Sequence, residues 1–183
     1  TKSINFDGTN DHLVTQVDST PVTNESRYYS WWGKSTTTSS NGVWDHGDYN
    51  IGSFRFNHSS GRPILYMANQ VYQYWTDNSL QDSGAWAHWV VKIKYNDVTG
   101  CELWCNGVKQ VKSDVFNSGS MNSYTTGIRI GRNGGNYFNG SIDEFSIHED
   151  LDEEAIRALY NRGRPIDISK SQGAYDLSDK ALH

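Results

Sequence analysis

The residues best suited to chemistry lie near the end of the chain, where an acid interrupts an apolar strand pattern. Ser141 to His148 alternates as a strand does, and Asp143 shares its parity with Phe145 and Ile147. A carboxylate on a core face needs compensation, because burying an unpartnered charge is costly. Asp143 can accept backbone N–H bonds, ligate a hard cation such as calcium, or be turned outward by a bulge near Ile142.

A second group of polar and aromatic residues runs from Val43 to Asn50. It combines two aromatic rings, two acids, a histidine and an asparagine, and its glycine and asparagine residues predict a turn-rich stretch. Asp45, Asp48 and Asn50 form a second possible oxygen cluster for a hard cation.

Signals for catalysis are poor. Glycoside hydrolysis usually needs two carboxylates about 5 to 9 Å apart across a cleft. The nearest acidic cluster, Glu149 to Glu154, instead begins a helix as its solvated first turn. The sequence has no Gly-x-Ser-x-Gly elbow and no nucleophilic Cys/His pattern, so we expect a protein that is not an enzyme.

The elements that must position these residues are mostly strands. Residues 86–95 alternate most clearly, and Asn106-Gly107 predicts a tight hairpin within residues 101–111. The one expected helix spans 152–161, because Asp152 can cap it and Ile156, Leu159 and Tyr160 form an apolar stripe. Other expected strands cover residues 3–6, 13–14, 27–34, 53–58, 63–67 and 127–131.

Composition limits the remaining possibilities. The 183 residues suit one domain, and a formal charge of -5 with scattered basic residues makes nucleic acid a poor partner. No apolar run approaches the roughly 20 residues of a membrane span, so we expect no membrane insertion. The first residue is not Met, which suggests a processed or excised fragment.

The two cysteines cannot pair with each other. Cys101 and Cys105 lie four residues apart in one expected strand, about 13 Å between Cα atoms, whereas a disulfide spans at most about 7 Å. We expect both to be small buried core residues.

Four segments in register resemble the laminin-G-like domains of the concanavalin A-like lectin/glucanase superfamily. They are Ile4–Gly8 with Asp11, Trp86–Val90, Leu103–Val108, and the run from Ile130 to Ile147 followed by Leu151–Asn161. The resemblance covers residues 2 to about 163. It implies an all-β fold, a two-sheet antiparallel β-sandwich of the jelly-roll type with one short C-terminal helix. We therefore expect one domain over 1–163 and a linker or tail over 164–183.

The resemblance also implies candidate site residues. In the family the first hairpin lies beside the last strand, which would bring Asp7 or Asp11 near Asp143, and calcium is frequent in the superfamily. By the same analogy Tyr29, Trp31 and Gly33 face the core. Trp31, Trp86 and Trp89 are expected to be structural. Ligand-binding candidates are residues of the other parity or of loops: Trp32, Trp44, Tyr49, Asn50, Tyr124, Asn136 and Tyr137.

These observations favour a lectin-like recognition module that binds a glycan or polysaccharide through loop and concave-face aromatics, with calcium as a possible cofactor. An alternative is a structural or assembly domain of a virion surface protein, bound to other virion proteins. Residues Gly163 to Ser169 are similar to linkers that follow such domains in phage structural proteins. The two hypotheses are compatible, because a lectin on a virion surface would serve host recognition. Either one implies an extracellular or virion-surface location. A polysaccharide-cleaving enzyme is the third and weakest alternative.

Overall fold

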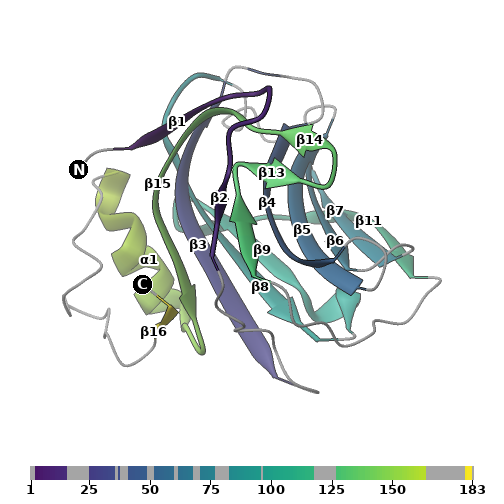
Figure 1. Ribbon diagram of the computed structural model, residues 1–183. Helices are drawn as coiled ribbons and strands as arrows, with labels where there is room; N and C mark the ends of the chain where they lie inside the picture. The colour runs from purple at the N-terminus through teal and green to yellow at the C-terminus, as the bar shows by residue number, and fades with distance from the viewer. Residues whose placement is uncertain are drawn as a thin grey trace.

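The chain folds into two antiparallel sheets packed face to face, with one helix on an outer side (Figure 1). This computed structural model describes residues 3–15, 25–35, 37, 41–48, 52–59, 62–67, 71–76, 83–95, 97–117, 127–163 and 180–182. The expected all-β sandwich with a short helix after the last long strand is confirmed.

The first sheet has the strand order β1-β15-β3-β8-β9-β10, and β16 also pairs with β15. Its strands are β1 (Ile4–Asp7), β3 (Ser26–Ser35), β8 (Ala87–Lys94), β9 (Glu102–Cys105), β10 (Val108–Lys109), β15 (Asn139–His148) and β16 (Lys180–Leu182). The predicted neighbourhood of the first and last long strands is confirmed, because β1 pairs with β15.

The second sheet has the order β11-β7-β6-β5-β4-β12-β2. Its strands are β2 (Leu13–Val14), β4 (Asn41–Asp48), β5 (Gly52–Ser59), β6 (Arg62–Met67), β7 (Val71–Trp75), β11 (Lys112–Asn117) and β12 (Ile128–Ile130). A small hairpin of β13 (Arg132–Asn133) and β14 (Asn136–Tyr137) links β12 to β15. Short 3-10 turns cover Val98–Gly100 and Asn161–Gly163.

The core between the sheets follows the predicted alternation of β3 and β8. Tyr29 and Trp31 point inward from β3, and Trp89, Val91 and Ile93 do so from β8. The inner faces interlock through aromatic rings, since Tyr29 stacks on Trp44 of the second sheet at 4.5 Å between centroids.

Two sequence expectations about aromatic and polar segments were wrong. The stretch from Val43 is strand β4 rather than a turn, because β5 and β12 pair with it on both sides. Trp86 is not a core residue. Its side chain is 38% exposed just before β8, and the Lys34 Nζ lies 5.5 Å from its ring centroid.

Helix α1 (Glu153–Tyr160) forms as predicted. The Asp152 carboxylate caps it by accepting the Ala155 N–H at 2.7 Å, and Asn161 ends it in the left-handed conformation. Ile156 and Leu159 are buried against the outer face of the first sheet, beside Tyr28, Val90 and Trp104.

The tight hairpin and the cysteines also agree with the sequence. Asn106 and Gly107 both have positive φ, +51° and +76°, and join β9 to β10. Cys101 and Cys105 are free and buried. Within the described chain, α1 is too short and too polar to cross a membrane.

Candidate functional site

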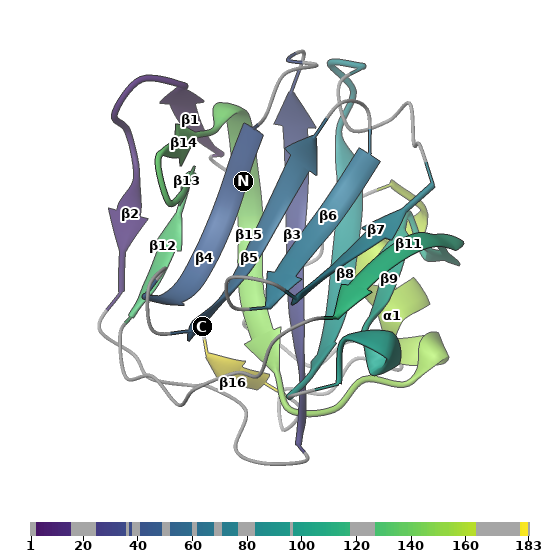
Figure 2. The ribbon, with the colours of Figure 1, turned by 90° about the vertical axis from the view of Figure 1, so that its right-hand side faces the viewer.

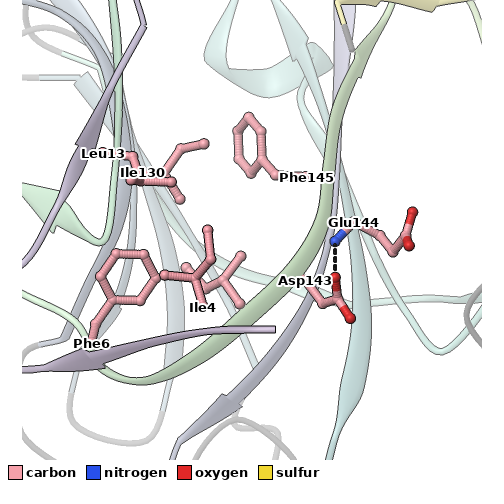
Figure 3. A pocket seen from close by; sticks show the side chains of 8 residues that line it. Ile4, Phe6, Leu13, Ile130, Asp143, Glu144 and Phe145 are labelled. Atoms are coloured by element: carbon pink, nitrogen blue, oxygen red, sulfur yellow. Dashed lines mark hydrogen bonds between the residues drawn. The ribbon is translucent and has the colours of Figure 1, made fainter. Parts of the chain in front are cut away.

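A bulge in β15 decides where Asp143 points. The pairing of β15 with β3 shifts register between Asp143 and Ser146, and Glu144 adopts a left-handed φ of +51°. Ile142 and Phe145 therefore both face the core, while Asp143 turns outward and its Oδ1 accepts the Glu144 N–H at 3.0 Å (Figure 3). Two of the predicted compensations, a bulge and a backbone N–H bond, are confirmed, and the bulge lies just beyond Ile142.

The predicted meeting of Asp143 with Asp7 or Asp11 was wrong. The register places Asp7 opposite Asn139, four residues before Asp143, which is about 13 Å along the strand. The hairpin carboxylates instead hold their own turn. Asp7 Oδ1 accepts the Thr9 N–H at 2.7 Å, and Asp11 Oδ2 accepts the Asp7 N–H at 3.3 Å.

These residues do not fit a calcium ion. A calcium ion takes six to eight oxygen ligands converging on one point, whereas Asp143 lies four residues along β15 from the residue opposite Asp7. Within the described ranges, no three His, Cys, Asp or Glu side chains gather as metal ligands.

Two predicted ligand-binding tryptophans are buried. Trp32 faces away from the core as expected, but α1 covers it, and Tyr160 stacks on it at 6.0 Å, which leaves 3% exposed. Trp44 lies in the core between Tyr29 and Phe56 with no exposed surface. Neither ring is available to a ligand.

The hairpin of β13 and β14 carries two other candidates, Asn136 and Tyr137. Asn136 is exposed, and Tyr137 is half-buried with the Arg132 guanidinium 5.2 Å from its ring centroid. The His12 ring lies 6.2 Å from the same tyrosine. Both candidates therefore remain on the surface. Tyr49, Asn50 and Tyr124 lie outside the described residues.

A buried ion pair anchors this hairpin to the second sheet. Asp45 has no exposed surface, and it accepts the Arg129 Nε at 2.6 Å and the Gly134 N–H at 3.1 Å. Burial raises the pKa of this carboxyl group, and the bonds from Arg129 and Gly134 oppose the rise. The Asp45 carboxylate therefore holds Arg129 and Gly134 in place and does not form the second oxygen cluster that the sequence suggested.

Two serine–histidine pairs lie on the outer face of the first sheet. Ser30 bonds His88 and Ser146 bonds His148, each at 2.9 Å, and all four residues are at most 2% exposed. Because they are buried, neither serine can reach a substrate, and the pairs satisfy polar groups in the packed layer.

The sequence analysis did not predict a row of side chains on the outer face of the second sheet. This face is turned to the viewer in Figure 2. The cross-strand register sets Arg55 beside Tyr66, Tyr66 beside Tyr72, and Tyr72 beside Phe116. We call these four residues the aromatic row. The Arg55 guanidinium lies 4.8 Å from the Tyr66 ring centroid, and Tyr72 and Phe116 stack at 5.0 Å.

The three rings of the aromatic row have polar neighbours and remain accessible, whereas Arg55 at its end is buried, with 7% exposed. Arg62 lies over Tyr74 at 4.4 Å and bonds Asp114 at 2.7 Å. Phe116 is 43% exposed, and Tyr66, Tyr72 and Tyr74 are half-buried. The parity of the expected strand at 63–67 would have revealed part of the row, because Tyr66 alternates with the buried Leu65 and Met67.

The sequence of the chain also matches a known protein family. Residues 7–156 match the profile of the Laminin G 3 family, described as the concanavalin A-like lectin/glucanases superfamily. The chain belongs to this family. No curated protein matches the sequence of this laminin-G-like domain.

Solved structures agree with the fold of this laminin-G-like domain. It matches domains LG4-5 of the mouse laminin alpha1 chain with a TM-score of 0.60 and 13% identity, over 80% of this chain and 41% of that one. The receptor binding domain of botulinum neurotoxin D matches with a TM-score of 0.64 and 16% identity, over 88% and 44%. The domain thus spans less than half of either chain.

A third match is to a domain that is covered over nearly its whole length. The CBM40 of the Ruminococcus gnavus IT-sialidase, bound to alpha2,3 sialyllactose, aligns with a TM-score of 0.61 and 13% identity, over 87% of this chain and 97% of that one. At these identities the similarity shows the shared fold.

Proposed function

We propose that this laminin-G-like domain is a non-catalytic module that binds carbohydrate on the outer face of its second sheet. The observation that carries the proposal is the aromatic row, Arg55, Tyr66, Tyr72 and Phe116, which crosses four neighbouring strands. Its accessible rings, Tyr66, Tyr72 and Phe116, lie on three neighbouring strands and at about 4.8 Å per strand span roughly 10 Å, long enough for a disaccharide.

The chemistry of the row suits a sugar. Pyranose rings present C–H faces that pack on aromatic rings, and they present hydroxyl groups that bond to charged and polar groups. The Tyr72 and Phe116 rings supply the first kind of surface, while Arg62 and Asp114 supply donors and acceptors at its edge. Apolar surface with a few placed polar groups is typical of ligand sites.

The comparisons support this proposal. The matched family includes lectins, and one structural match of nearly equal extent was solved with a bound sialyllactose. We also infer that the domain acts outside the cell or on a particle surface, where glycans are met.

A glycan array tests the proposal with the wild-type domain and with Tyr72→Ala. The row predicts that at least one glycan class binds the wild type and that Tyr72→Ala weakens it about tenfold or more, as for a central interface aromatic. If no glycan binds the folded domain, the proposal fails.

The array is best repeated with a calcium chelator. The family resemblance implies calcium, whereas Asp7 and Asp143 lie apart on the described strands, and the aromatic row needs no metal. We expect binding to survive chelation. Loss of binding in the chelator would assign the ligand to another surface.

A further inference from the structure

Strand β11 contains one residue more than the stretch of β7 that pairs with it in the second sheet (Figure 2). The paired residues are Lys112 with Trp75, Val115 with Gln73, Phe116 with Tyr72 and Asn117 with Val71. Ser113 and Asp114 therefore lie opposite the single residue Tyr74, which is the arrangement of a β-bulge. Because a strand alternates between its two faces, one extra residue exchanges the faces of the residues that follow it.

The bulge places Phe116 in the aromatic row. Without the extra residue, Val115 would lie opposite Tyr72 on the outer face, and Phe116 would point inward. Two contacts confirm the exchange of faces. The Lys112 Nζ donates to the Thr99 carbonyl, in the turn between β8 and β9 of the first sheet. The Phe116 ring instead stacks on Tyr72 on the outer face, although residues four apart in a regular strand share one face.

The side chain of Gln73 holds the backbone of the bulge. It is 2% exposed and lies on the inner face of β7, with Val71 and Trp75. Its Nε2 donates to the Asp114 carbonyl oxygen at 2.9 Å and also to the Tyr74 carbonyl oxygen. These carbonyls belong to the two strands at the bulge, where the ladder of backbone hydrogen bonds is interrupted. A carbonyl shielded from water needs a donor, and the Gln73 amide supplies it to both.

The other forces on β11 do not fix its register. A regular register would turn Phe116, which is 43% exposed, toward the core, and burial of an aromatic side chain is favourable. The ion pair of Arg62 with Asp114 favours the bulged strand, but its side chains are 38% and 66% exposed. An ion pair that is open to solvent contributes little to stability. The buried amide of Gln73 is therefore the contact that selects the bulged register.

We infer that Gln73 is a positioning residue of the carbohydrate site. Its side chain points into the sandwich, so it acts through β11, by keeping Phe116 rather than Val115 beside Tyr72. Without this amide the row would keep the rings of Tyr66 and Tyr72 and would shorten by one strand spacing, about 4.8 Å. The inference rests on the proposed carbohydrate binding only for its effect on affinity.

NMR of the ligand-free domain tests the position of the ring. The Tyr72 and Phe116 ring centroids are 5.0 Å apart, so the wild type should give a nuclear Overhauser effect between the two rings. We expect Gln73→Leu to remove this signal and to leave the domain folded, since leucine is close to glutamine in size. Gln110→Leu is the matched control and should keep the signal, because the Gln110 Nε2 also donates to a backbone carbonyl, that of Val108, at 2.7 Å.

An exchange of two neighbouring side chains tests the register directly. In the Gln73→Leu background, Val115→Phe combined with Phe116→Val should place the ring at position 115 beside Tyr72 and restore a ring-to-ring signal. The same exchange in the wild-type background alters only exposed side chains and should leave valine beside Tyr72, with no ring-to-ring signal.

Three results would overturn the inference. They are a Phe116 signal of wild-type strength in Gln73→Leu, no ring beside Tyr72 after the exchange in that background, and a ring beside Tyr72 after the exchange in the wild-type background. The last result decides the question even if Gln73→Leu does not fold.

Glycan affinity gives a second readout. Gln73→Leu should weaken binding of the best array glycan about tenfold, as loss of the Phe116 ring would, and the exchange in that background should restore the affinity. If the wild type binds no glycan while the ring signals behave as expected, the carbohydrate proposal fails and the role of Gln73 in the register stands. If Gln73→Leu binds the glycan as the wild type does and keeps the ring signal, only the role of Gln73 fails.

Discussion

His58 should make the folded domain sensitive to acid, and Leu in its place should remove that contribution. Its ring is 4% exposed and lies 5.7 Å from Phe56 and 5.4 Å from Trp89, between centroids. Both ring nitrogens are buried without a hydrogen-bond partner in the described structure. Burial lowers the pKa of His58 from 6.5 to about 3.

The sign follows from where the proton binds. The unfolded chain protonates His58 near pH 6.5, whereas the folded chain resists protonation down to about pH 3. Stability is therefore complete above pH 6.5 and falls as the pH drops through the window between 6.5 and 3. Linkage gives a loss of about 2 kcal/mol from His58 between pH 7 and pH 5. His88 adds a second contribution of the same sign, because burial, and then the charge of His148, lowers its pKa to about 3.

Urea denaturation at pH 7 and pH 5 measures this effect for the wild type and His58→Leu. At pH 7 the variant should gain about 1 kcal/mol, because an unpartnered polar ring is replaced by an apolar side chain. At pH 5 the gain should grow to about 3 kcal/mol. A gain that stays the same at both pH values would refute the argument from burial.

Three other contacts are tested by substitutions in the same denaturation assay. Gly131→Ala should cost about 2 kcal/mol or more, because φ is +87° and a Cβ would overlap the Phe6 ring, whereas Gly135→Ala has open space and should stay within about 0.5 kcal/mol. Equal effects at the two glycines would contradict this packing. Asp45→Asn should cost about 2 kcal/mol by weakening the buried bonds to Arg129 and Gly134, and an unchanged midpoint would refute that role. Asp152→Ala should cost about 1 kcal/mol through loss of the helix cap, and the loss of helical circular dichroism should accompany it.

Local patterns predicted the elements that depend on local physics. The alternation of residues 86–95 predicted β8, because successive side chains of a strand point to opposite faces of the sheet. Asp152 gave the start of α1, and Asn106-Gly107 gave the hairpin, because caps and positive φ values are properties of a few neighbouring residues.

Long-range packing decided what the sequence could not predict. Asp45, His46 and Gly47 are residue types that are common in turns, but they lie in a central strand. Residues far away in sequence hold them there, because Arg129 bonds Asp45 and Tyr29 bonds His46. Trp32 has the predicted parity and is still covered, because α1 returns over it from the end of the chain.

The predicted calcium site failed for the same reason, because it depends on the register between β1 and β15. The pairing of β1 with β15 was expected, yet the position of Asp7 along β15 depends on which residues pair, and Asp7 pairs with Asn139. Asp143 lies four residues further along β15, so about 13 Å of strand separates it from the residue opposite Asp7. Adjacency of strands alone therefore does not predict a shared ligand site.

The most direct test of the proposed carbohydrate site is the affinity of the domain for its best array glycan in two variants of one strand. Phe116 belongs to the aromatic row, whereas its neighbour Val115, which is 50% exposed, has the opposite strand parity. We predict that Phe116→Ala weakens binding about tenfold and that Val115→Ala leaves it unchanged. Equal affinities of the two folded variants for the glycan would contradict a binding site on this face.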